Sequence, residues 1–281
     1  IILQKSLKMG WKVTSISSKL PRKKRYLAKV KYILCDITKK RSLRKNIRKS
    51  FNYVVNLGGY VDHSNRKKTF ESHYLGCKNL AEIFLNKKPI AFVQMGSSAE
   101  YGDVKSPQKE SARCNPKSVY GKAKLLSSIY LINLFKKQKF PSTILRLYNT
   151  YGPRQDLNRF IPIVISGCVK NKKFPCSEGN QIRDFLHIDD VVGAILKSLT
   201  NKKARGQIIN IGSGEPRIIK NIIEYIKKIS KGGFPLFGRV KLRKDEILIS
   251  YPNINKAKNK INWRPKISFR KGLKVTIDTF K

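Results

Sequence analysis

The chain has 281 residues, of which 40% are hydrophobic and 28% are charged, and a formal net charge of +44. This apolar content is enough for the packed core of one large domain or two coupled lobes, which argues against an intrinsically disordered chain. No apolar run approaches the roughly 18 residues of a membrane helix, and no signal-peptide pattern opens the sequence. These features favour a cytoplasmic enzyme or binding protein without a membrane partner.

The large positive charge raises the alternative of a nucleic-acid-binding protein, because such a field attracts polyanions. However, the 61 Lys and Arg residues are spread over the whole length. No helix-turn-helix, zinc-finger or RNP-type pattern accompanies them. We interpret the charge as a compositional bias of solvated faces and expect no specific nucleic-acid partner.

The cysteines give no sign of a metal or redox site. The five of them are scattered and lack CxxC spacing: Cys35, Cys77, Cys114, Cys168 and Cys176. An odd number at such spacing predicts reduced thiols and no bound metal.

In chain order, short apolar strands alternate with helical patterns. We expect helices over 2–8, 42–50, 76–85 and 119–137, and strands over 11–17, 31–34, 53–57, 90–95 and 142–147. Strands separated by helices of this length pair in parallel, so the pattern predicts an α/β, doubly wound sheet of the Rossmann type with ligands at the carboxyl ends of its strands. We expect residues 1–150 to form this domain. Residues 151–281, which are punctuated by Pro and Gly, would mainly form a smaller substrate-binding lobe, with some segments packing back on the first domain.

The most informative motif combines Ser97, which follows the strand over 90–95, with Tyr120 and Lys124 at the start of a helix. Positions four apart share a helix face, so the Lys124 ammonium would lie near the Tyr120 phenol and lower the pKa of this phenol from about 10. A phenol tuned in this way can exchange a proton with a carbinol or carbonyl oxygen that a serine hydroxyl holds. This arrangement is typical of dehydrogenases.

Seven segments in chain order carry a family resemblance. They are Asp36–Ile37, Gly58–Gly59, Gly96–Gly102, Tyr120–Lys124, Leu145–Arg154, Arg183–Asp190 and Asn210–Gly214. The chain resembles the NAD-dependent epimerase/dehydratase family, the extended, nucleotide-sugar-modifying branch of the short-chain dehydrogenases. The resemblance implies catalytic roles for Ser97, Tyr120 and Lys124.

The resemblance also implies binding residues. NAD or NADP would contact Ser17, Asp36, Ile37, Leu57, Gly58, Gly59, Tyr120, Lys124 and Leu147. The nucleotide sugar would contact Ser98, Asn149, Arg183 and Arg243. Plain alternatives stay open: Asp36 and the Gly58–Gly59 pair as turn residues, and Arg243 with Glu246 as part of a solvated face.

Three departures from the family pattern qualify these expectations. The first strand and the glycine-rich phosphate loop are missing from the sequence, so we expect these residues alone to bind cofactor poorly. Ser17, followed by basic residues, stands where an acidic residue would grip the ribose and tilts the prediction toward NADP. Ala99 occupies the position of the acid that 4,6-dehydratases need, and strand-like alternation would point Glu100 elsewhere.

The predicted function is therefore that of an NAD(P)-dependent nucleotide-sugar epimerase or 4-keto reductase. A non-catalytic dinucleotide sensor on the same fold remains an alternative. The helix over 119–137 has an apolar face wide enough for a homodimer, although core burial would explain that face equally well.

Overall fold

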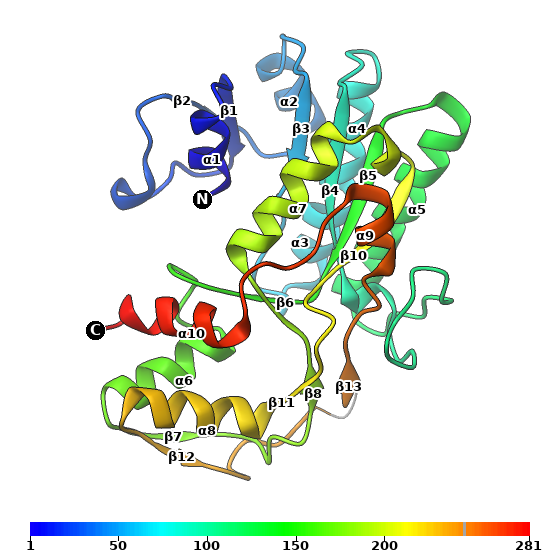
Figure 1. Cartoon of the computed structure of the whole chain (residues 1–281). Helices are drawn as coiled ribbons and strands as arrows, with labels where there is room; N and C mark the ends of the chain where they lie inside the picture. Colours follow the sequence, from blue (N-terminus) through cyan, green and yellow to red (C-terminus); the bar gives the residue numbers. More distant parts are fainter. Residues whose placement is uncertain (244–245) are drawn as a thin grey trace. The chain divides into compact units, whose positions relative to one another are not determined.

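The structure is a computed structural model that describes residues 1–243 and 246–281 (Figure 1). The chain divides into two compact units. Unit 1 comprises Ile1–Glu100, Pro116–Leu145 and Ile195–Ile208, and unit 2 comprises Tyr101–Asn115, Arg146–Ala194 and Ile209–Lys281. Each unit is assembled from three separate stretches, so its core forms only when residues far apart in the sequence meet.

Unit 1 alternates strands with helices. Its helical elements are α1 (Ile2–Lys8), η1 (Lys23–Arg25), α2 (Lys40–Asn46), α3 (Arg66–Phe70), the π-helical turn η2 (Glu71–Leu75), α4 (Gly76–Leu85), η3 (Ser98–Glu100), α5 (Val119–Gln138) and η4 (Lys202–Ala204). Its strands are β1 (Val13–Ser17), β2 (Val30–Leu34), β3 (Tyr53–Asn56) and β4 (Ala91–Ser97). Three further elements begin in one unit and end in the other: β5 (Ser142–Leu147), α7 (Ile188–Thr200) and β10 (Gln207–Ile211).

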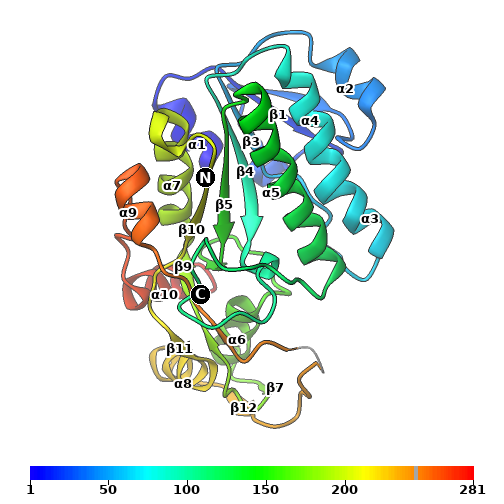
Figure 2. The ribbon, with the colours of Figure 1, turned by 90° about the vertical axis from the view of Figure 1, so that its right-hand side faces the viewer.

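The strands form one four-stranded sheet of order β10-β5-β4-β3 and a separate parallel pair, β1 with β2. Strands β3 and β4 are parallel, with Tyr53 opposite Ala91. Figure 2 shows α4 and α5 on one side of this sheet and α7 on the other. The α/β sheet with helices on both faces confirms the predicted fold class, and it places the carboxyl ends of β3 and β4 at one edge.

Strand β4 is buried along almost its whole length, as expected for a central strand covered on both faces. The core of unit 1 packs side chains of this sheet against α2, α4 and α5. Its buried members are Cys35, Leu43, Ile47, Cys77, Leu80, Ala81, Ile83, Phe84, Phe92, Leu131, Leu134, Phe140 and Ile144.

Most element boundaries agree with the sequence prediction to within two residues, but one helical segment was missed. Helical backbone before Gly76 begins at Arg66, where the Asn65 side chain caps the helix by accepting from Lys68 N. The polar sequence of this first turn hides its helical character, because its stability comes from the cap and from packing against α5. The predicted helix over 42–50 also lies earlier, at Lys40–Asn46.

Unit 2 has shorter elements. Its strands are β6 (Asn149–Tyr151), β7 (Lys173–Pro175), β8 (Ile182–Arg183), β9 (Phe185–His187), β11 (Arg217–Ile218), β12 (Phe234–Leu236) and β13 (Ile249–Ser250). Its helices are α6 (Phe160–Val169), α8 (Ile219–Ser230), α9 (Asn255–Ile261) and α10 (Phe269–Asp278). Helices α6, α8 and α10 enclose its own hydrophobic core, in which Ile165, Ile226 and Leu273 are fully buried.

Within the described residues, none of the helices is both long and apolar enough to cross a membrane.

Candidate functional site

The first two turns of α5 carry Tyr120 and Lys124. The helix begins after Ser118, whose hydroxyl accepts a hydrogen bond from Gly121 N at 3.0 Å. The Lys124 side chain is buried, and its Nζ donates to the carbonyl oxygen of Met95 on β4 at 2.7 Å. Lys124 Nζ also lies 5.8 Å from the centre of the Tyr120 ring. The shared helix face thus brings the ammonium near the Tyr120 ring, as the spacing predicts.

Burial changes the acidity of Lys124. Desolvation lowers the pKa of Lys124 from 10.5 to about 8, while the nearby Glu100 and Cys77 act in the opposite direction. The same burial raises the pKa of the Cys77 thiol to about 12, so this thiol is neutral at ordinary pH. Lys124 is therefore a weaker base than an exposed lysine.

Ser97 ends β4, and Ser98 begins the following turn η3; both are partly exposed. The Ser97 hydroxyl accepts a hydrogen bond from Ala99 N at 3.2 Å. Helix α5 presses against this turn, because a Cβ added to Gly121 would collide with the carbonyl oxygen of Ala99. Unit 1 therefore brings the turn with Ser97 and Ser98 to the first turn of α5, where Tyr120 stands.

Two histidines surround the Tyr120 ring, and the sequence did not identify either as part of the site. The exposed His63 stacks on the ring with centroids 4.2 Å apart, and His73 meets it edge-on at 4.9 Å. His73 is 6% exposed and its Nε2 donates to Tyr60 O at 3.2 Å, whereas its buried Nδ1 has no hydrogen-bond partner in the described part of the chain. Burial, followed by the charge of Lys124, lowers the pKa of His73 to about 3. His73 is therefore an uncharged side chain packed against the Tyr120 ring.

The predicted cofactor residues of unit 1 lie at the carboxyl ends of β1, β2 and β3. Ser17 ends β1, and its hydroxyl donates to Lys19 O. Asp36 follows β2 and is exposed; its Oδ1 accepts from both Thr38 N and Thr38 Oγ1 at 2.8 Å, which makes an Asx-type turn. Leu57 follows β3 and is 56% exposed.

Side chains of unit 1 pack closely against Gly58 and Gly59. A Cβ on Gly58 would stand 2.6 Å from Ile37 Cδ1, and Asn56 Oδ1 accepts from Gly58 N at 3.0 Å. A Cβ on Gly59 would overlap the imidazole of His73. The space beside each glycine is thus filled by a side chain of the same unit.

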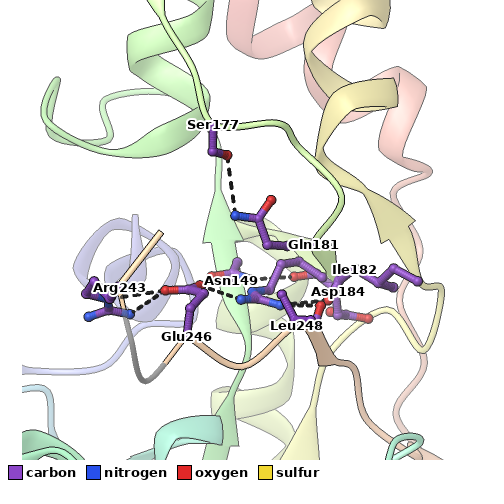
Figure 3. Close-up of polar contacts among 9 residues, drawn as sticks. Asn149, Ser177, Gln181, Ile182, Asp184, Arg243, Glu246 and Leu248 are labelled. Carbon is purple, nitrogen blue, oxygen red and sulfur yellow. Dashed lines mark hydrogen bonds and ion pairs between the residues drawn. The ribbon is translucent and has the colours of Figure 1, made fainter. Parts of the chain in front are cut away.

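The predicted sugar-binding residues Asn149, Arg183 and Arg243 lie in unit 2. The Glu246 carboxylate joins the two arginines, and Figure 3 shows its contact with Arg243. Arg183 Nη2 donates to Glu246 Oε1 at 2.6 Å, and Arg243 Nη2 donates to Glu246 Oε2 at 3.0 Å. Arg183 Nη1 also donates to the carbonyl oxygens of Ile182 and Leu248. The Arg243 side chain is 78% exposed and that of Arg183 only 15%. We name this group, Arg183, Arg243 and Glu246, the arginine cluster.

Asn149 begins β6, and its Nδ2 donates to the backbone oxygen of Asp184 at 3.1 Å. Leu147, predicted to contact the nicotinamide, ends β5 and is partly exposed.

Two of the three acidic residues in segment 183–190, Asp184 and Asp190, accept hydrogen bonds from the backbone of unit 2. The Asp184 carboxylate accepts from Ser213 N, Ser213 Oγ and Gly214 N, and the Asp190 carboxylate accepts from Lys266 N and Ile267 N. Among the residues that the structure describes, no group of three or more His, Cys, Asp or Glu side chains is arranged to hold a metal ion.

Comparison with known proteins identifies the family of the chain. The model of the family described as "NAD dependent epimerase/dehydratase family" matches residues 2–212. The chain belongs to this family. The pairing of Ser97 with Tyr120 and Lys124 lies inside the matched region.

Individual relatives differ in their reactions. A Methanocaldococcus jannaschii protein named provisionally as a UDP-glucose 4-epimerase is 32% identical over 74% of this chain and 68% of its own length. A CDP-abequose synthase of Salmonella typhimurium is 34% identical over 46% of this chain and 45% of its own length, so the chain spans less than half of that relative. A Thermotoga maritima UDP-glucose 4-epimerase, whose structure was solved with UDP-glucose, has a TM-score of 0.90 at 23% identity over 99% of this chain and 94% of that one. This last similarity shows the shared Rossmann-type fold.

Proposed function

We propose that the chain is an NAD(P)-dependent nucleotide-sugar epimerase or 4-keto reductase in which Tyr120 is the acid/base. One observation carries the proposal: the buried Lys124 ammonium is fixed on Met95 O and lies 5.8 Å from the Tyr120 ring. A cation held at this distance favours the phenolate, so the phenol can gain and lose a proton near working pH. Several relatives are named for reactions on UDP- or CDP-linked sugars, which supports this substrate class.

Unit 1 has side chains suited to bind a dinucleotide at two positions. The exposed Asp36 carboxylate and the Ser17 hydroxyl follow consecutive parallel strands, as residues that hold an adenosine do. Tyr120 and Lys124 stand near the end of β4, at the corresponding position for the nicotinamide ribose. When bound, the nicotinamide accepts or supplies the hydride at the sugar carbon.

Side chains of unit 1 would then bind the oxygen on the reacting carbon and transfer its proton. The Ser97 hydroxyl would hold this oxygen by a hydrogen bond, Tyr120 would donate or remove its proton, and Lys124 would stabilise the phenolate. In unit 2, the guanidinium groups of Arg183 and Arg243 suit the diphosphate oxygens of the substrate, which would replace the Glu246 carboxylate as their partner.

Dehydratase activity is disfavoured in this proposal. Elimination of water needs an acidic side chain at the position of Ala99. Glu100 does not supply one, because it is fully buried and both carboxylate oxygens accept hydrogen bonds within unit 1. We retain the preference for NADP on the basis of Ser17 and the basic residues after it, and expect NADPH to bind more tightly than NADH. A homodimer through α5 also remains proposed, since Leu126 and Ile129 are 39% and 47% exposed.

The deciding experiment measures nicotinamide absorbance for the full-length protein with UDP- and CDP-linked sugars and their 4-keto derivatives, in comparison with Tyr120→Phe. Stoichiometric consumption of NADPH with a 4-keto sugar would establish a reductase, and inversion of the sugar without net cofactor change an epimerase. If the protein binds cofactor but neither reaction occurs, and Tyr120→Phe behaves identically, the enzyme proposal is wrong and the dinucleotide sensor takes its place.

A further inference from the structure

Glu100 carries a buried carboxylate that takes no part in the proposed reaction. The sequence pattern suggested that its side chain points away from the site, but residues 98–100 form a 3-10 turn, for which strand alternation does not hold. The residue is fully buried. A buried carboxylate is costly unless hydrogen bonds and an opposite charge stabilise it, so its environment indicates its role.

The two oxygens of Glu100 connect the two elements that carry the proposed catalytic residues. Oε1 accepts from Ser97 N at 2.9 Å, and Oε2 accepts from the hydroxyl of Ser128 on α5 at 2.7 Å. Ser128 is one helical turn beyond Lys124 and two turns beyond Tyr120. Glu100 therefore ties the backbone of the Ser97 turn to the helix of the proton-transfer pair.

Glu100 is also a negative charge that acts on Lys124. The other titratable groups around this ammonium are Cys77 from α4 and His73 from η2, and burial keeps both uncharged near neutral pH. Lys124 Nζ also lies 5.8 Å from the centre of the Tyr120 ring, on which His63 stacks. Burial favours the neutral amine of Lys124, and Glu100 opposes this effect.

We propose that Glu100 is a positioning residue that fixes the Ser97 turn against α5 and supplies the charge that keeps Lys124 an ammonium beside Tyr120. The inference rests on the proposed acid/base role of Tyr120. Lys124 Nζ lies 5.8 Å from the centre of the Tyr120 ring, whereas the Glu100 carboxylate is held by Ser97 N and by Ser128, two helical turns beyond Tyr120. We expect the attraction of the ammonium to outweigh the direct repulsion of the carboxylate.

The first test titrates the Tyr120 phenol by its ultraviolet absorbance, taken as the difference between each protein and the same protein with Tyr120→Phe. Glu100→Gln keeps the shape and removes the charge, so Lys124 loses its proton earlier and Tyr120 should titrate about one pH unit higher. Ser128→Ala removes one hydrogen bond but keeps the charge, and should leave the titration within about 0.3 pH unit. Thermal unfolding confirms that each variant is folded.

An unchanged titration in folded Glu100→Gln would overturn the inference, as would an equal shift in Ser128→Ala. This measurement uses no sugar substrate, so it stands even if the proposed reaction is not found. The second test applies the same variants to turnover: in Glu100→Gln, the limb of the kcat profile due to Tyr120 should move up by about one pH unit, with KM for the sugar within about twofold. A rise in KM without a moved limb would assign Glu100 a structural role only.

Discussion

The proposed proton-transfer residues of unit 1 and the arginine cluster of unit 2 differ in burial and in the kind of partner that holds them. Lys124 is 5% exposed and held by a backbone carbonyl oxygen, and the partly buried Tyr120 ring contacts His63 and His73. Arg243, in contrast, is largely exposed, and its described partner is the Glu246 side chain.

This difference in burial and in partners matches the different tasks that we propose for the two groups of residues. A group that transfers protons must keep its geometry and a tuned acidity, which burial and fixed backbone partners provide. A group that binds a mobile anion must exchange its partner, and a carboxylate can be replaced at a guanidinium fork by phosphate oxygens of similar geometry. The contrast predicts that substitutions in unit 1 affect kcat and stability, and substitutions in the arginine cluster affect affinity.

The largest expected effect concerns Lys124, the buried cation of unit 1. Lys124→Met should lower kcat about a hundredfold with little change in KM, because the cation that stabilises the phenolate is lost. Lys122→Met is the matched control, since Lys122 is exposed on the same helix. Steady-state kinetics of both variants measure the difference, and equal losses would show that Lys124 has no special role.

The next prediction concerns the contact between α5 and the Ser97 turn. Gly121→Ala places a Cβ against the Ala99 carbonyl oxygen and should cost about 2 kcal/mol of unfolding free energy, together with a loss of kcat. Gly193→Ala on α7 is the control, because its Cβ would meet no atom closer than 3.8 Å and alanine favours a helix. Urea unfolding of the two variants should give changes of opposite sign; a stable, active Gly121→Ala would show that the contact can relax.

A pH experiment tests how strongly unit 1 excludes charge. Because folding lowers the pKa of His73 from 6.5 to about 3, the unfolded chain takes up a proton first as the pH falls. Stability that His73 contributes is thus complete above pH 6.5 and is lost progressively toward pH 3. When the pH is lowered from 7 to 5, the free energy of unfolding should fall in both proteins. The fall should be smaller in His73→Asn than in the unaltered protein, by up to about 2 kcal/mol. Urea unfolding at both pH values measures this, and the exposed His63→Asn should not reproduce it.

The smallest effect belongs to the arginine cluster. Glu246→Gln removes the carboxylate that competes for Arg183 and Arg243, so UDP and CDP should bind roughly fivefold more tightly, about 1 kcal/mol, with an advantage that shrinks in salt. Asp278→Asn removes a carboxylate paired with Lys281 at the end of α10, also in unit 2, and is the control. Weaker calorimetric binding in Glu246→Gln would mean that Glu246 itself contacts the nucleotide.

The sequence predicted most helices and strands because their hydrophobic periodicity is a local property of the chain. The helix that carries Tyr120 and Lys124 was placed to within one residue at its end, and strand 142–147 was placed with both ends correct. The helical turns over 66–75 were missed because a polar first turn and a π-helical segment lack the regular period.

Spacing in the sequence by itself determined that Tyr120 and Lys124 share a helix face, because four residues are about one helical turn. Only the tertiary structure decided the surroundings of that pair: His63 and His73 around the ring, Met95 O at the ammonium, and Glu100 turned inward. It likewise decided that Glu246 joins Arg183, 63 residues away, to Arg243. The physical reason is that burial and partner choice depend on segments distant in the chain, which no local pattern encodes.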